Sequence, residues 1–216
     1  MSDFFLTINN LNKTYSPNKL ILNNLNHSFK KEEIISIQGD NGSGKTTLLR
    51  ILSTLSLPSS GLITLDDLPL EVVSKKYRHF IGWMPSGSNG LYSKLTGLEN
   101  IYFFASFYNL DLLHLNQEIE VWKSNSLFKE AINQKFYLCS TGMKNILLLF
   151  KALMHKPKMI LLDEPLASFD NETALFASKM ITLNIKNKIV LFTSHQAQDV
   201  KKLATRTLFL RGGMLV

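Results

Sequence analysis

The sequence is poor in cysteine. Its 216 residues include a single cysteine, Cys139, which excludes a disulfide within the chain. Structural disulfides belong to oxidising compartments, and a chain without them is typical of a reducing compartment. Stability must therefore come from a hydrophobic core, and a chain of this length can bury a substantial one within a single domain.

Long hydrophobic runs are also missing. Apolar clusters such as ILLLF at 146–150 are far shorter than the roughly 18 residues that a membrane-spanning helix needs. The N-terminal MSDFFLTINN carries an early acid and lacks the basic and apolar segments of a signal peptide. We therefore expect a soluble chain that works at a membrane only through a partner.

Acidic residues are outnumbered by basic ones, 17 to 24, which gives a net charge of +7. Such a charge permits an anionic partner, for example a nucleotide, a nucleic acid or an acidic lipid. An ordinary solvated basic surface explains it equally well. Charge alone therefore does not identify the partner.

Short apolar runs alternate with longer helical patterns along the chain. The runs at 33–39, 79–85, 158–165 and 188–195 are predicted to be buried strands, and 45–55 a helix. This alternation predicts an α/β fold with a parallel sheet and helices on its faces. Between about 96 and 156 the strand pattern is lost, and the stretches 100–110 and 145–155 predict helices instead. We expect a helical insertion into an α/β core.

The stretch GDNGSGKT at 39–46 fits the phosphate-binding loop G-x-x-x-x-G-K-[ST], with a predicted strand before it and a helix after it. Its glycines let the backbone wrap around an anion at a helix N-terminus. Lys45 can reach the β- and γ-phosphates, the Thr46 hydroxyl can ligate Mg²⁺, and Thr47 can bond the α-phosphate. The predicted nucleotide-binding residues here are Gly39, Asp40, Asn41, Gly42, Ser43, Gly44, Lys45, Thr46 and Thr47.

A second motif, MILLDEP at 159–165, is an apolar run that ends in two acids. A buried strand of this kind places its acids at the carboxyl edge of the sheet, where α/β proteins bind ligands. We expect Asp163 to hold Mg²⁺ through water. Glu164 would act as general base on the water that attacks the γ-phosphate.

These motifs together resemble the nucleotide-binding subunits of ATP-binding cassette (ABC) transporters over nearly the whole chain. The stretch 163–170, DEPLASFD, is similar to that family's Walker B motif and D-loop, with Ser168 and Asp170 at matching positions. TSH at 193–195 is similar to its switch region, which implies that His195 contacts the γ-phosphate. Tyr15 matches the aromatic residue that stacks on adenine.

The stretch CSTGM at 139–143 stands where this family has its signature, LSGGQ. The resemblance implies that the Ser140 hydroxyl and the Gly142 amide close over ATP held by a second subunit, most simply an identical one. Thr141 replaces a glycine and does not easily adopt a positive φ, but we expect the variant to be tolerated. Cys139 replaces a leucine and is expected to be a small buried packing residue.

Two positions depart from the family pattern. Ser86 stands where a glutamine normally contacts Mg²⁺, and no glutamine occurs between residues 81 and 95. A serine hydroxyl can ligate through water, but it is shorter than glutamine. The stretch MKNIL at 143–147 also lacks the arginine that usually follows the signature. Both changes bring the ATPase rate and its coupling into question.

The resemblance implies an ATP- and Mg²⁺-dependent ATPase at the cytoplasmic face of the inner or plasma membrane. It would drive transport through an integral membrane subunit, and the stretch 90–110 resembles exporter-type members with drug, polysaccharide or haem substrates. The resemblance also implies an antiparallel β-subdomain beside the P-loop core. We expect one ABC domain, with residues 1–89 and 157–216 as the nucleotide-binding core and 90–156 as a helical subdomain.

Two alternatives stay open. A soluble ABC-type regulator of nucleic acid or ribosomes suits the basic charge, but such proteins typically carry two cassettes or long coiled-coil arms, which this sequence lacks. We therefore do not expect nucleic acid as a partner. A slow or degenerate nucleotide-binding subunit is suggested by Ser86, whereas the intact Glu164 and His195 oppose it.

Overall fold

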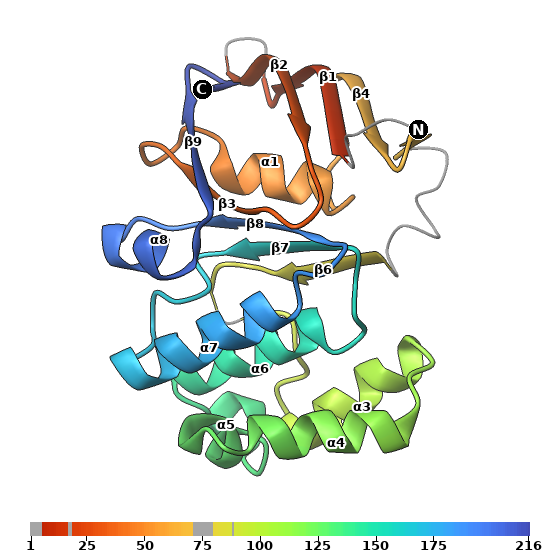
Figure 1. The fold of residues 1–216 in the computed structure, drawn as a ribbon, viewed down its shortest axis with the longest axis vertical. Helices are drawn as coiled ribbons and strands as arrows, with labels where there is room; N and C mark the ends of the chain where they lie inside the picture. Colours follow the sequence, from red (N-terminus) through yellow and green to blue (C-terminus); the bar gives the residue numbers. More distant parts are fainter. Residues whose placement is uncertain (1–5, 17–18, 71–79, 88) are drawn as a thin grey trace.

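A six-stranded sheet crosses the middle of the molecule (Figure 1), in the order β10-β9-β3-β8-β7-β6. The computed structural model describes residues 6–16, 19–70, 80–87 and 89–216. Strands β9, β3, β8, β7 and β6 are parallel neighbours, whereas β10 pairs antiparallel with β9. The strands are β3 (Ile34–Gln38), β6 (Ile81–Met84), β7 (Met159–Asp163), β8 (Ile189–Thr193), β9 (Arg206–Arg211) and β10 (Met214–Leu215). The predicted α/β fold with a parallel sheet is confirmed.

The central strands are buried on both faces, which explains their continuous apolar runs. In β7, Met159 and Leu161 join a core shared with the N-terminal strands and α1 (Lys45–Leu52). Ile160 and Leu162 join a second core shared with the helices on the opposite face. Neighbouring side chains of a strand point to opposite faces, so one short strand supplies both cores. The stretch predicted at 79–85 contains β6, but its first residue lies outside the described residues.

A smaller, four-stranded antiparallel sheet covers α1, in the order β2-β1-β4-β5. Its strands are β1 (Leu6–Thr14), β2 (Leu20–Phe29), β4 (Ser60–Leu65) and β5 (Leu68–Pro69). Figure 1 shows α1 between this sheet and the six-stranded one. The predicted antiparallel β-subdomain is therefore present.

Helix α1 is shorter than the predicted 45–55. It ends at Leu52 because Thr54 has a φ of 61°, which is outside the right-handed helical region. The amides of Leu55 and Ser56 then both donate to the carbonyl of Arg50, at 2.9 and 3.1 Å. The chain thus turns back towards β4 one helical turn earlier than the apolar pattern indicates.

Between β6 and β7 the chain is helical, as predicted. The helices are α3 (Gly97–Phe107), α4 (Leu112–Trp122), α5 (Ser126–Ala131) and α6 (Thr141–Leu153), with a 3-10 turn at Phe136–Leu138. α7 (Asn171–Leu183) follows β7, and α8 (Ala197–Leu203) follows β8. α6 and α7 lie on the face of the sheet opposite α1 (Figure 1). In the described part of the chain, none of the helices combines the length and apolarity needed to cross a membrane.

Candidate functional site

The loop between β3 and α1 requires glycine at two positions. Gly44 caps α1 with a φ of 106°, and a Cβ there would lie 2.7 Å from Cγ2 of Ile21. Gly39 has a φ of 151°, and a Cβ would lie 2.5 Å from the Leu210 carbonyl oxygen. Both positions combine a left-handed backbone with close neighbours, so a side chain at either would open the loop.

Lys45 is held inside this loop. Its side chain is buried, and Nζ donates to the carbonyl oxygens of Gly39, at 2.7 Å, and Asp40, at 3.0 Å. An ammonium group has three donors, and these two bonds leave one for an anion above the loop. The loop therefore fixes a positive charge at its centre.

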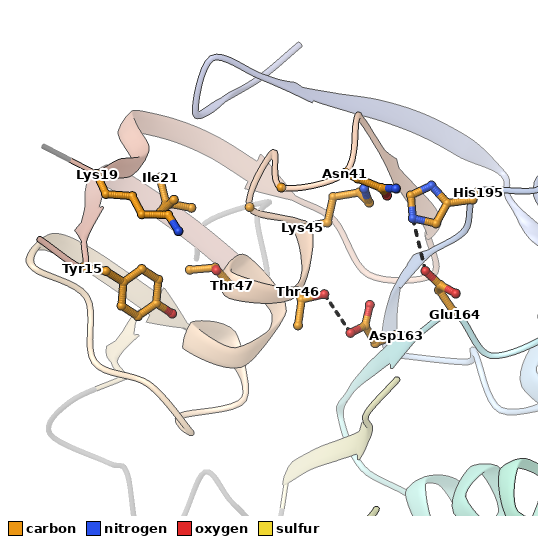
Figure 2. Close-up of a pocket in the computed structure, with 12 residues that line it drawn as sticks. Tyr15, Lys19, Ile21, Asn41, Lys45, Thr46, Thr47, Asp163, Glu164 and His195 are labelled. Atoms are coloured by element: carbon orange, nitrogen blue, oxygen red, sulfur yellow. Dashed lines mark hydrogen bonds and ion pairs between the residues drawn. The ribbon is translucent and has the colours of Figure 1, made fainter. Parts of the chain in front are cut away.

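Asp163, at the end of β7, is buried, and both its carboxylate oxygens are bonded. Thr46 Oγ1 donates to Oδ2 at 2.9 Å (Figure 2), and Thr193 Oγ1 donates to Oδ1 at 2.6 Å. Thr193 also accepts the backbone amide of Glu164, at 3.0 Å. The Thr193 hydroxyl, at the end of β8, thus positions both Asp163 and Glu164. The sequence analysis assigned no role to Thr193, although it is the first residue of the TSH motif.

Glu164 and His195 face each other at the mouth of the site. His195 Nε2 lies 3.2 Å from Glu164 Oε1, and both side chains are partly exposed (Figure 2). Exposed pairs of this kind add little to stability. Glu164 has a φ of 55°, a left-handed conformation that costs a residue other than glycine about 1–2 kcal/mol. Strain of this kind gathers at functional sites.

These groups surround one cavity of about 380 Å³. Its lining includes most of the predicted residues: Tyr15, Asn41, Gly42, Gly44, Lys45, Thr46, Thr47, Asp163, Glu164 and His195. Lys19 and Ile21 line it as well (Figure 2) and were not predicted. No local pattern indicated them: Lys19 immediately precedes β2, and Ile21 is the second residue of that strand.

Other predicted residues lie off the lining of this cavity. Gly39, Asp40 and Ser43 shape the loop without lining the cavity, and Ser86 is an exposed residue just after β6. Ser140 and Gly142 also lie elsewhere, at the start of α6. Ser140 and Gly142 are predicted to contact the ATP of a second subunit. Their position outside this cavity is compatible with that prediction.

The start of α6 explains two substitutions in the signature. Ser140 caps the helix by accepting the Met143 amide, at 3.2 Å, and Thr141 is the first helical residue. A helical position does not need glycine, so Thr141 fits there. Cys139 is buried, as predicted, and burial raises the pKa of its thiol. It is therefore a packing residue and a poor nucleophile.

We expect Thr193→Val to destabilise the fold by about 1–3 kcal/mol, because it leaves a buried carboxylate oxygen without its donor and the Glu164 amide without its acceptor. Urea unfolding measures this change. Thr182→Val is the matched control, because Thr182 Oγ1 donates to a carbonyl oxygen within α7, at 2.9 Å, away from the site. Equal losses in the two variants would contradict the role assigned to Thr193.

The family profile described as "ABC transporter" matches residues 22–167. The chain belongs to this family. The ABC transporter ATP-binding protein NatA of Bacillus subtilis (strain 168) is 30% identical over 190 residues, which is 88% of this chain and 77% of NatA. The lipoprotein-releasing system ATP-binding protein LolD of Wigglesworthia glossinidia brevipalpis is 32% identical over 219 residues, which is 97% of this chain and 95% of LolD.

The solved dimeric structure of MJ0796, described as a bacterial ABC transporter cassette, matches with a TM-score of 0.85. It is 26% identical, and the match covers 97% of this chain and 96% of that one. A second structure of MJ0796, in a post-hydrolysis state with ADP and Pi, matches with a TM-score of 0.83. Our chain is thus an ATP-binding, ATP-hydrolysing subunit of an ABC transporter, a family whose subunits pair and work with membrane subunits.

Proposed function

We propose that this ABC subunit hydrolyses MgATP in the cavity described above, with the catalytic work carried by Lys45, Glu164 and His195. The observation that carries the proposal is their convergence: a fixed ammonium, a hydroxyl–carboxylate pair and a carboxylate–imidazole pair line the same cavity. Phosphoryl transfer needs mainly positioned charges around the γ-phosphate.

In this arrangement Tyr15 stacks on the adenine and the loop amides hold the phosphates. The Tyr15 ring is exposed, at 56%, and Lys13 Nζ lies 4.9 Å from its centre. The open face of the ring is free to accept a base. Thr47, on the first turn of α1, reaches the α-phosphate, and the remaining donor of Lys45 reaches the β- and γ-phosphates.

Mg²⁺ is the expected metal, and the donor set fits it. The Thr46 hydroxyl and the Asp163 carboxylate lie 2.9 Å apart, and both are the hard oxygen ligands that Mg²⁺ prefers. Across the described residues, no cluster of three or more His, Cys, Asp or Glu side chains is suited to a metal. A site with few protein ligands matches an ion that is completed by phosphates and water. When bound, Mg²⁺ would neutralise charge that develops on the phosphates.

Glu164 is proposed as the general base. It accepts a proton from water as the water oxygen forms a bond to the γ-phosphorus and the bond to the bridging oxygen of ADP breaks. Asp163 is unsuited to this role, because both its oxygens already accept hydrogen bonds in a buried position. His195 is proposed to donate a hydrogen bond to the γ-phosphate, and its position beside Glu164 supports this role.

Ser140 and Gly142 are proposed to act on the ATP of a second subunit, most simply another copy of this chain. Their place at the N-terminus of α6 supports this, because such an end attracts phosphate.

We further propose that the two subunits work at the cytoplasmic face of the membrane and drive export. Relatives named for Nod factor export and linearmycin resistance support that direction, although another is named for phosphonate import. The division into a core, 1–89 and 157–216, and a helical subdomain, 90–156, remains part of this proposal.

Steady-state phosphate release by the purified chain tests the function. We expect Mg²⁺- and ATP-dependent release that Glu164→Gln slows at least about 100-fold. Release at an undiminished rate in this variant would contradict the assignment of the base.

Ser86 supplies a further prediction. If a glutamine at this position normally helps to position Mg²⁺ and the attacking water, Ser86→Gln should raise the turnover number roughly 3- to 10-fold, the scale of one hydrogen bond. Ser86→Met is the matched control, since it has similar length and no amide. Phosphate release at saturating MgATP decides the matter. Equal or lower turnover of a folded Ser86→Gln protein would mean that the serine is an adaptation of this loop.

A further inference from the structure

Asn145 is a buried polar residue that the proposed chemistry does not use. It lies in α6, near the start of the helix, and only 7% of its surface is exposed. Its Nδ2 donates to Oγ of Ser168 at 2.7 Å. Ser168 belongs to the loop that joins β7 to α7, so this bond connects the signature helix to the loop that follows Glu164.

A second contact lies beside this bond. A Cβ added to Gly142 would be 3.3 Å from the carbonyl oxygen of Ser168. The first turn of α6 therefore lies directly against the loop, and the small residue at 142 permits the approach. Asn145 and Gly142 contact the same residue, from the same side.

The loop between β7 and α7 is also fixed at both of its ends. At the first, the Glu164 amide donates to Thr193 Oγ1. At the second, Asp170 caps α7 by accepting the Thr173 amide at 2.7 Å, and this hydrogen bond lowers the pKa of Asp170. Ser168 lies between these anchors. α6 therefore contacts a short segment that starts at Glu164 and is held at both ends.

Stability does not explain an asparagine at this position. Asn145 Oδ1 is buried and has no hydrogen-bond partner among the described residues. An unsatisfied buried acceptor destabilises the fold, and a leucine, whose side chain has the same branched shape, would avoid that cost. The neighbours Ile146 and Leu147 are apolar and fully buried, so the site itself suits a hydrophobic residue. The bond to Ser168 is what a leucine would lose.

We propose that Asn145 is a positioning residue that fixes the signature turn, with Ser140 and Gly142, to the loop after Glu164. This inference rests on the proposed function, in which the signature turn closes on the ATP of the second subunit and Glu164 acts on the subunit's own ATP. Through this bond, closure of the signature turn on the partner's ATP would shift Glu164 at the subunit's own ATP. Asn145 itself touches neither nucleotide.

Asn145→Leu removes the bond and keeps the branched shape of the side chain. In a Glu164→Gln background, where ATP is trapped, we expect this change to weaken MgATP-dependent dimerisation about tenfold, as measured by sedimentation, the scale of one lost hydrogen bond. The affinity of the monomer for ATP, measured by fluorescence titration, should change less than about twofold, since Asn145 does not line the cavity. Unaltered dimerisation would overturn the proposal.

Ser168→Ala completes a double-mutant cycle by removing the other partner of the bond. Because Ser168 is only half-buried, this variant can be measured even if Asn145→Leu folds poorly. If Asn145 acts through Ser168, adding Asn145→Leu to Ser168→Ala should change dimerisation little. Additive effects would overturn the proposal.

Amide hydrogen exchange gives an answer that does not need a dimer. In the nucleotide-free chain, we expect Asn145→Leu to speed exchange of the amides of 166–170 about tenfold while the amides of β8 keep their rates. Unchanged exchange in 166–170 would overturn the role of Asn145. A Glu164→Gln chain that stays monomeric with MgATP would instead count against the proposed trans arrangement, so the two failures are distinguishable.

Discussion

Lys45→Ala is expected to weaken ATP binding about 100-fold, or roughly 3 kcal/mol, the upper range for a hydrogen-bonding group with full charge. The ammonium is the cation that the loop buries, and it is already oriented by the carbonyl oxygens of Gly39 and Asp40. Its removal deletes the donor that we propose for the β- and γ-phosphates and leaves those two carbonyls without their partner. Titration with a fluorescent ATP analogue measures the loss.

Lys179→Ala is the matched control for this variant. Lys179 is an exposed residue of α7 and does not line the cavity, so this variant loses the same charge without touching the site. It should bind ATP as the unaltered chain does. Equal affinity of the Lys45→Ala and Lys179→Ala proteins would refute the assignment of the phosphate loop.

The sequence predicted those parts of the fold whose chemistry is local. β7 and β8 are buried on both faces, so each appears as an unbroken apolar run. The phosphate loop was predictable because Gly39 and Gly44 adopt conformations that other residues avoid. Asp163 and Glu164 followed from their place at the end of a buried strand.

What could not be predicted depends on tertiary contacts. Lys19 and Ile21 reach the cavity because a separate antiparallel sheet packs over α1, and no local pattern reports that arrangement. The early end of α1 at Leu52 depends on a β-branched residue, Thr54, in a left-handed conformation that its intrinsic preferences oppose. The role of Asn145 also could not be predicted, because its partner Ser168 is brought to it only by the packing of α6 on the loop after β7.

Glu164→Gln should slow phosphate release at least about 100-fold, the usual contribution of a general base. The substitution keeps the length of the side chain and the backbone bond to Thr193, so the fold and the left-handed turn at 164 are retained. Its amide can still contact His195, but it cannot take a proton from water. ATP should therefore bind and remain intact, whereas in Lys45→Ala it binds poorly.

Trapped ATP should also hold two subunits together, because the signature turn of each is proposed to close on the ATP of the other. Light scattering at saturating MgATP should then show the Glu164→Gln protein as a dimer, and removal of MgATP should return it to a monomer. The Lys45→Ala/Glu164→Gln double variant is the control, since it lacks the ammonium that anchors the phosphates and should stay monomeric in both conditions.

A Glu164→Gln protein that binds ATP yet remains a monomer would contradict the proposal that Ser140 and Gly142 act across the dimer. Undiminished phosphate release would contradict the assignment of Glu164 as base, because no other carboxylate among the described lining residues has an oxygen free of hydrogen bonds to protein hydroxyls.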